Sequence, residues 1–277
     1  MIKLSVFEEL HKFIEGGELH VSIHTIRKAV RRLLNEFDTT ILTQPKRVEV
    51  EELVEQLGFH LRYESLSRGI EILGVTCFGT MNIPVVSSDT GSKEPRLISA
   101  NTVVINSLLL DEKYKGRYAY TVAHEIGHIV FDNLKMREAK QASRQEMLEQ
   151  LADGDGLSVS AFLAKHKKED DERLRQEEKR VERVCDNFAA CLLLPDETVE
   201  MLIREEICKY RPANASNCLY IHGGEDDVKF VKGLIDKISE LYGASRETTV
   251  YKVRDTRLIR GAGDILEVLM KNNYGFT

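Results

Sequence analysis

The segment Tyr120-Thr-Val-Ala-His-Glu-Ile-Gly-His-Ile-Val-Phe131 constrains the fold of this 277-residue chain more than any other. It combines a polar triplet, His124, Glu125 and His128, with apolar residues at Val122, Ile126, Ile129 and Val130. Residues four apart project from nearly the same face of a helix, so the two imidazoles share a face only if the segment is helical. Burying such a triplet is costly unless each polar group finds a partner. The sequence therefore predicts a buried helix with a polar site on it.

The spacing H-E-x-x-H is typical of helices that bind zinc in peptidases. His124 and His128 are the expected ligands. Glu125 lies about 100° further round the helix and is the expected general base. A zinc ion lowers the pKa of water toward neutrality, and a nearby carboxylate can take the proton during attack on a peptide carbonyl. The alternative is a buried histidine pair that ordinary hydrogen bonds satisfy.

A catalytic zinc ion usually has three protein ligands, so a third ligand is expected from a later segment. The segment 181–195 turns apolar just after two carboxylates four residues apart, Glu182 and Asp186. Glu182 is predicted to bind the metal. Asp186 is predicted to accept the spare N–H of a ligating histidine, with a surface or capping role as its alternative. Glu177 and Glu178 compete with Glu182, but their charged surroundings favour a solvated face.

The cysteines give no sign of a disulfide framework, because their number is odd and no C-x-x-C pair is present. Cys185 and Cys191 lie next to the expected third ligand, where packing in the core is the preferred interpretation. Cys77 allows a second interpretation, in which its thiol fills the open metal position and silences the enzyme. A buried apolar cysteine is the preferred prediction for it.

The first half of the chain contains the strand candidates, which have alternating or β-branched residues bounded by turn formers. They are residues 59–63, 70–78 and 97–106. The stretch from Pro84 to Pro95 is expected to be a loop or a hairpin end. Helical periodicity predicts helices over most of 1–42, over 48–57, and over nearly all of the chain after Tyr118. Within that last part, Ser245 is expected to cap a helix that begins at Glu247.

These elements predict an α+β fold. A small mixed or antiparallel sheet packs on the H-E-x-x-H helix in a zincin-like arrangement, and a mostly helical C-terminal part follows. The expected division is an N-terminal helical segment over 1–44, a peptidase core over 45–199 and a helical, helix-turn-helix-like part over 200–277. A polar insertion is expected at about 135–180 within the core.

The formal net charge of -6 and the pI of about 5.8 argue against a protein that lives mainly by binding nucleic acid. Four cations lie together on the expected first helix: Arg27, Lys28, Arg31 and Arg32. Nearby acidic residues favour a solvated helix face over a nucleic-acid patch. No apolar run approaches the roughly 20 residues of a membrane span, and Glu8 and Glu9 interrupt any secretory signal. A cytoplasmic location without membrane binding is therefore expected.

The two motif segments together resemble the ImmA/IrrE family of metallopeptidases. The family pattern H-E-[IL]-G-H occurs here as His124-Glu-Ile-Gly-His128, and the pattern E-x-x-A-[ND]-x-F-A-x-x-L-L-x-P corresponds to Glu182–Pro195. The segment Leu241–Ile259 is similar to the helix-turn-helix-like end of these proteins. There are three departures: Cys185 replaces the usual alanine, about 53 residues separate the motifs, and the N-terminus shows no fused repressor-type DNA-binding domain.

The resemblance implies a zinc-dependent endopeptidase with His124, His128 and Glu182 as ligands and Glu125 as base. It also implies a protein substrate, a helix-turn-helix transcriptional repressor whose cleavage relieves repression. Two alternatives are a metal-containing regulator that displaces a repressor without cutting it, and a DNA-binding regulator that uses its C-terminal helices. The sequence leaves open which group stabilises the oxyanion. The candidates are Tyr118, Tyr120, Tyr210, Tyr220 and His222.

Overall fold

The structure of the chain is a computed structural model that describes residue 2 and residues 14–15, 18–19, 21–67, 69, 71–87, 91–142, 172–211 and 218–261. Its contacts form two compact units. The first contains Met1–Phe37 and Glu49–Ala189, and the second contains Asp38–Val48 and Ala190–Thr277. The three-part division expected from the sequence stays a prediction.

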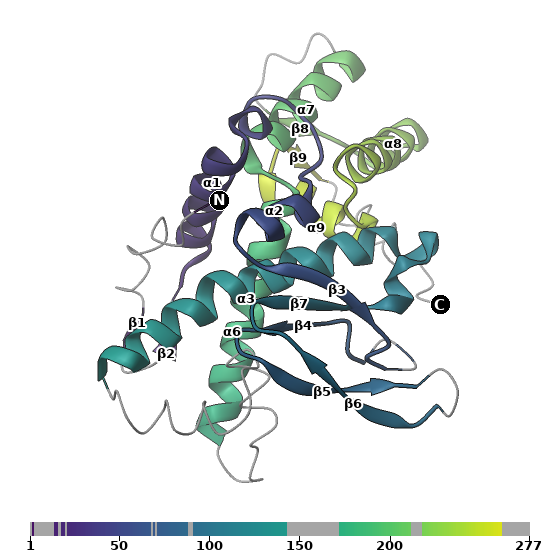
Figure 1. Ribbon diagram of the computed structural model, residues 1–277. Helices are drawn as coiled ribbons and strands as arrows, with labels where there is room; N and C mark the ends of the chain where they lie inside the picture. Colours follow the sequence, from purple (N-terminus) through teal and green to yellow (C-terminus); the bar gives the residue numbers. More distant parts are fainter. Residues whose placement is uncertain are drawn as a thin grey trace. The chain divides into compact units, whose positions relative to one another are not determined.

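A three-stranded mixed sheet lies at the centre of the first unit (Figure 1). Its order is β3 (His60–Glu64), β7 (Thr102–Asn106) and β4 (Gly74–Cys77), with β3 parallel and β4 antiparallel to β7. The run Thr-Val-Val-Ile-Asn suits β7 to the central position, and all five of its residues are buried. The strands predicted at 59–63 and 70–78 are confirmed as β3 and β4, with shorter bounds for β4.

A hairpin of β5 (Met81–Val86) and β6 (Lys93–Ile98) forms a separate two-stranded sheet. Residues of β5 alternate between buried and exposed, and its buried side packs in an apolar cluster with Leu66, Cys77 and Val104. The hairpin end expected between the two prolines is confirmed, but it lies between Val86 and Lys93, because Pro84 and Pro95 lie opposite one another inside the strands. Each strand of a two-stranded sheet has an outer edge, where a residue without an N–H group is tolerated.

The single strand predicted at 97–106 is also wrong. Residues 97–98 end β6, residues 102–106 form β7, and these strands belong to different sheets. Between them Asn101 has a φ of 55°. Asparagine adopts this left-handed conformation more readily than most residues, so the chain can turn here from the β5–β6 hairpin into the three-stranded sheet.

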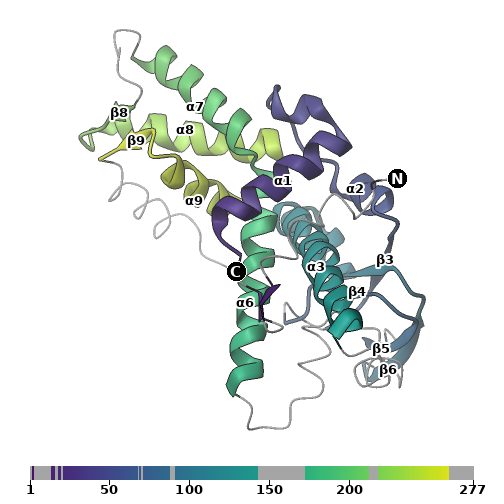
Figure 2. The same cartoon turned by 90° about the vertical axis from the view of Figure 1, so that its left-hand side faces the viewer.

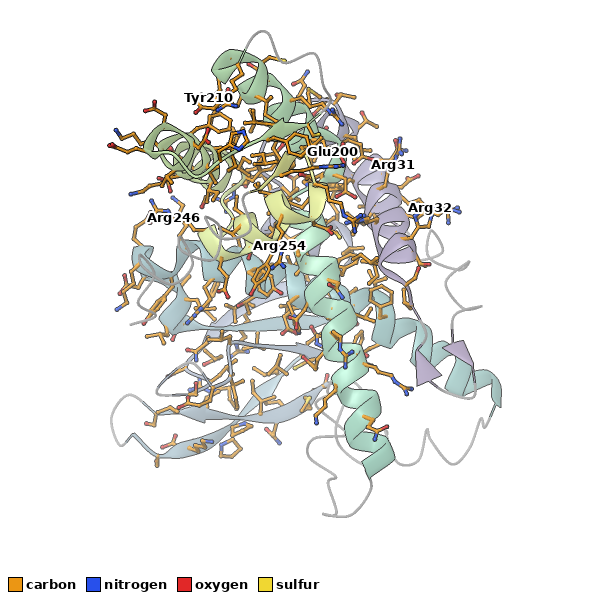
Figure 3. The ribbon with its side chains drawn as sticks, turned by 180° about the vertical axis from the view of Figure 1, so that it is seen from behind. Arg31, Arg32, Glu200, Tyr210, Arg246 and Arg254 are labelled. Atoms are coloured by element: carbon orange, nitrogen blue, oxygen red, sulfur yellow. The ribbon has the colours of Figure 1, made fainter. Side chains whose placement is uncertain are left out.

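The N-terminal part is less helical than expected. Residues 14–19 contain a short antiparallel pair, β1 (Ile14–Glu15) and β2 (Glu18–Leu19), before helix α1 (Ile23–Phe37) begins. The helical periodicity that predicted this helix rests on apolar residues, of which four are at most 3% exposed: Ile26, Val30, Leu33 and Leu34. Ile23, at the start of the same apolar series, is instead 44% exposed. Arg31 and Arg32 project from the helix (Figure 3).

The H-E-x-x-H segment lies in α3 (Lys115–Ala142), which follows two short 3₁₀ turns, Ser107–Leu110 and Glu112–Tyr114. The prediction of a buried helix is confirmed, since the following residues are at most 1% exposed: Val122, Ala123, Ile126, Ile129, Val130 and Phe131. Helix α3 packs on β4, on β7 and on α2 (Val50–Gln56), and Figure 2 shows it running beside the sheet.

Helix α6 (Glu172–Leu193) carries the second motif and passes from the first unit into the second. It lies close to α3, because a Cβ atom at Gly127 would be only 3.0 Å from the Cα atom of Cys185. Phe131 and Phe188 also meet edge to face, with ring centroids 5.7 Å apart. The ends of the expected polar insertion at 135–180 belong to α3 and α6, and its remainder lies outside the described residues.

The second unit is mostly helical, which confirms the expected helical C-terminal part. Its elements are the 3₁₀ turn η2 (Thr39–Leu42), α7 (Asp196–Tyr210), α8 (Glu225–Tyr242), α9 (Arg246–Thr256) and a parallel pair, β8 (Leu219–Tyr220) and β9 (Ile259–Arg260). Ser245 caps α9 as predicted, because its hydroxyl accepts the N–H of Thr248 at 3.1 Å. Gly243 has a φ of 66° and ends α8.

The described part of the chain therefore has an α+β fold with seven α-helices and small sheets. None of these helices combines the length and the apolar character that a membrane crossing needs.

Candidate metal centre

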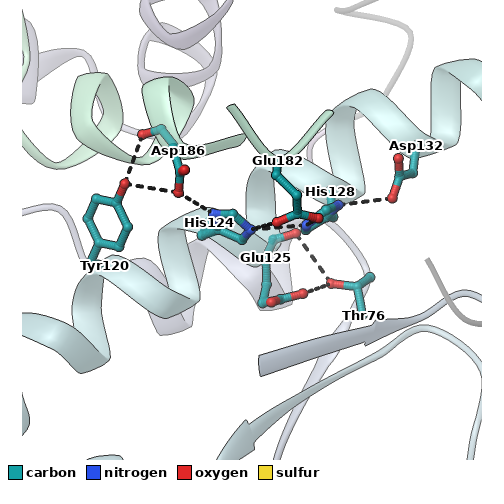
Figure 4. Close-up of polar contacts among 8 residues, drawn as sticks. All are labelled: Thr76, Tyr120, His124, Glu125, His128, Asp132, Glu182 and Asp186. Atoms are coloured by element: carbon teal, nitrogen blue, oxygen red, sulfur yellow. Dashed lines mark hydrogen bonds and ion pairs between the residues drawn. The ribbon is translucent and has the colours of Figure 1, made fainter. Parts of the chain in front are cut away.

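Three of the predicted residues converge on one point in the first unit. His124 and His128 project from α3, and Glu182 faces them from α6 (Figure 4). The Nε2 atoms of the two histidines are 3.1 Å apart. Oε2 of Glu182 is 3.2 Å from His124 Nε2, and Oε1 is 3.6 Å from His128 Nε2. These three side chains can therefore hold a metal ion.

Each histidine is oriented through its other ring nitrogen. Nδ1 of His124 lies 3.0 Å from Oδ1 of Asp186, and Nδ1 of His128 lies 3.0 Å from Oδ2 of Asp132. An ionised carboxylate only accepts hydrogen bonds, so Nδ1 is the donor in both contacts. In a neutral imidazole this leaves Nε2 with a lone pair. Both lone pairs then point into the same small space opposite a carboxylate, an arrangement that favours a proton or a metal ion between them.

The donor set and its spacing fit zinc. Ligand atoms about 2.0–2.1 Å from a tetrahedral zinc ion are about 3.3–3.4 Å from one another. The corresponding distances here, among His124 Nε2, His128 Nε2 and the Glu182 oxygens, are 3.1–3.6 Å, a range that includes the value expected for zinc. Two imidazoles with one carboxylate is also a ligand set of catalytic zinc sites.

The charges of the surrounding groups attract a cation. Burial lowers the pKa of His124, but hydrogen bonds with Asp186 and Glu182 outweigh it and raise that pKa to about 9. Burial likewise lowers the pKa of His128, yet the contact with the Asp132 carboxylate holds it well above the ordinary value. Burial raises the pKa values of Glu182 and Asp186, but the histidines bring both below their usual values. Without a metal ion, the raised pKa values favour protonation of this histidine pair.

Glu125 lies on the sheet side of the same helix and is 5% exposed. The hydroxyl of Thr76 on β4 donates to its Oε2 at 2.7 Å (Figure 4). Gly74 precedes Thr76 by two residues on this strand, and a Cβ atom there would be 2.6 Å from Oε1 of Glu125. The carboxylate is thus enclosed between α3 and β4 and is held by a donated hydrogen bond.

Sequence reasoning missed Asp132, Thr76 and Tyr120 as parts of this cluster. Asp132 is four residues after His128, a helical spacing that could have drawn attention to it. Tyr120, which the sequence offers as a candidate oxyanion donor, instead donates to Oδ1 of Asp186 at 3.1 Å. No signal in the sequence pointed to Thr76, because its contact with Glu125 joins residues 49 apart.

The cysteines near the site are buried, as preferred in the sequence analysis. Burial raises the pKa of Cys77 to about 12 and that of Cys185 to about 11. Thiols with such pKa values are almost fully protonated near neutral pH, and only a thiolate binds zinc well. Cys77 and Cys185 also lie outside the group of donor atoms that converge on one point.

The other candidates from the sequence fall into different places. The side chains of Glu177 and Glu178 are not among the described ones. Tyr118 forms a hydroxyl–hydroxyl hydrogen bond with Tyr63 at 2.8 Å. The remaining oxyanion candidates Tyr210, Tyr220 and His222 belong to the second unit.

Comparisons with known proteins assign no family. No protein-family profile matches the chain. No curated protein matches it by sequence. Among solved structures, a Mycobacterium tuberculosis transcriptional regulator aligns over 90% of this chain with 12% identity and a TM-score of 0.36. The chain spans about half of that protein, 51% of its length. A likeness at this score and identity establishes neither a shared fold nor a shared function.

Proposed function

We propose that this chain is a zinc-dependent endopeptidase of the ImmA/IrrE type. The observation that carries the proposal is the pair of Nε2 atoms 3.1 Å apart, each on a histidine whose Nδ1 contacts a carboxylate. Glu182 completes a three-ligand set, and a buried glutamate lies next to the first histidine in the chain. A structural metal site would not need the additional buried carboxylate, whereas hydrolysis needs a base beside the metal.

The residues divide the work of hydrolysis among them. His124, His128 and Glu182 would hold the ion. When bound, zinc supplies a Lewis acid that polarises the scissile carbonyl and makes water nucleophilic near neutral pH. Glu125 accepts the proton of the attacking water and can return it to the leaving amine. Asp186 keeps His124 in the tautomer that offers Nε2.

The proposed substrate is a helix-turn-helix transcriptional repressor. Support for this comes from the paired motifs, His124–His128 and Glu182–Pro195, and from the similarity of Leu241–Ile259 to the end of ImmA/IrrE proteins. The net charge of -6 agrees with a protein substrate better than with DNA as the main partner.

The substitution Glu125→Gln tests the catalytic role. It leaves all three ligands in place, so the variant should bind zinc as the wild type does. Zinc-loaded wild-type protein and variant are incubated with the helix-turn-helix repressor encoded beside the gene, and fragments are identified by mass spectrometry. The cleavage rate should fall about a hundredfold to ten-thousandfold in the variant.

Two further measurements separate the alternatives. If the protein displaces the repressor without cutting it, wild type and Glu125→Gln should relieve repression equally well in a reporter assay, and neither should produce fragments. A regulator that binds DNA would show salt-sensitive binding to the operator in the absence of the repressor.

A further inference from the structure

Asp132 is a fully buried carboxylate that the hydrolytic scheme above does not use. It lies on α3 one turn after His128, directly after the fully buried Phe131, and its own exposure is 0%. Its Oδ2 is 3.0 Å from His128 Nδ1. Among the described residues, its Oδ1 has no hydrogen-bond partner. Burying a carboxylate in such apolar surroundings is costly, so a residue of this kind is expected to have a specific task.

The contact with His128 Nδ1 indicates that task. It has a counterpart in the contact of Asp186 with His124 Nδ1, at the same distance of 3.0 Å. The two pairs differ in their surroundings. The side chain of Asp186 is 53% exposed and also accepts from Tyr120, whereas Asp132 is closed off from solvent. Hydrogen bonds to charged groups are stronger where water does not compete, so Asp132 holds its histidine more firmly.

We infer that Asp132 is a positioning residue for the metal ion, acting through His128. By accepting the Nδ1–H of this imidazole, it fixes the tautomer and ring orientation that present Nε2 to the ion. A charged acceptor at Nδ1 also raises the basicity of Nε2, which makes this nitrogen a stronger ligand for the metal ion. The inference rests on the metal centre proposed above but not on proteolysis.

Zinc affinity of the full-length chain tests this role, measured by competition with a chromophoric chelator. Asp132→Asn keeps the shape of the side chain and removes its charge, and Asp132→Ala removes the acceptor as well. Both should weaken zinc binding about tenfold to a hundredfold, with the larger effect for alanine. Asp186→Asn should weaken it less than Asp132→Asn does. With cobalt(II) as a second probe, the visible absorption bands of the Asp132 variants should shift, because the orientation of one ligand changes.

Phe188→Leu provides the matched control. Phe188 is fully buried and packs edge to face against Phe131, the neighbour of Asp132, and it is not one of the proposed ligands. It should lower the melting temperature of the metal-free protein and leave the zinc affinity unchanged. A purely structural Asp132 would behave in the same way as this control.

The outcomes are distinct. If wild-type protein binds zinc and Asp132→Asn binds it within about twofold of wild type, the positioning role is wrong and the proposed function stands. If wild-type protein fails to bind zinc, the metal centre itself is wrong and the inference falls with it. Loss of cleavage in Glu125→Gln has no bearing on either result.

Discussion

The substitution Gly74→Ala should damage catalysis without touching a metal ligand. The new Cβ atom would lie 2.6 Å from Oε1, 2.9 Å from Cγ and 3.0 Å from Cδ of Glu125, where ordinary contacts begin at 3.4 Å. The end of the glutamate must therefore move by about 0.8 Å, which is a large displacement for a packed side chain. Because misplacing a reacting group by about 1 Å can cost a hundredfold in rate, we expect a loss of that order. Overpacking of this kind should also destabilise the fold by about 1–3 kcal/mol.

Cleavage rate, zinc affinity and urea denaturation together measure the effects of this substitution. Zinc affinity should stay at the wild-type level, since the Glu125 side chain is not a proposed ligand. Gly233→Ala in α8 is the matched control, because a Cβ atom there meets nothing within 4 Å. It should leave cleavage unchanged and stabilise the helix by about 0.5–1 kcal/mol. Cleavage and stability of Gly74→Ala equal to wild type would refute the view that β4 encloses the base.

Further tests address the neighbouring groups. Thr76→Val removes the hydroxyl that donates to Glu125, and because hydrogen bonds to charged groups contribute about 1.5–3 kcal/mol, cleavage should fall roughly tenfold to a hundredfold. Thr76→Ser should restore most of it, and equal rates for valine and serine would contradict the role of this hydroxyl. Burial raises the pKa of Cys77 from 9.0 to about 12, so its thiolate fraction at pH 9 is far below one half. Iodoacetamide reacts with thiolates and should therefore label the exposed Cys208 before Cys77, as mass spectrometry of the labelled protein would show. Early labelling of Cys77 in the folded protein would contradict its burial. Removing zinc with a chelator should abolish cleavage and lower the melting temperature, because a ligand at 100 times its Kd stabilises the folded state by about 2.7 kcal/mol. An unchanged melting temperature would argue against a metal bound in the folded state.

The sequence predicted best where one local pattern determines the structure. The apolar residues around His124 and His128 were enough to place a buried helix, and the four-residue spacing brought the imidazoles together. Glu182 was found through its own helical segment, which ends in an apolar run. Each inference needs only the periodicity of its own helix, α3 or α6, and the structure brings all three side chains within reach of one ion.

Sequence reasoning failed where the structure depends on the backbone conformation of a single residue or on a contact between residues distant in sequence. The turn at Asn101 divides an apparently continuous strand, and nothing in the β-forming residues around it marks that break. Thr76 reaches Glu125 only because β4 packs on α3. The second unit combines residues 38–48 with residues from 190 onward, a pairing that depends on packing rather than on sequence order.

The close approach of α6 to Gly127 restricts which residues can stand between the two histidines of the motif. Helix α6, which carries Glu182, passes close to α3 between the two histidines, where a Cβ atom at Gly127 would lie 3.0 Å from the Cα atom of Cys185. Backbone cannot rotate away as a side chain can, so alanine would have to push the carboxylate of Glu182 outward by a few tenths of an ångström. Homologues in which the two helices approach as closely should therefore have the motif H-E-x-G-H. Chains with a larger residue at the position of Gly127 should take their third metal ligand from an element placed differently from α6.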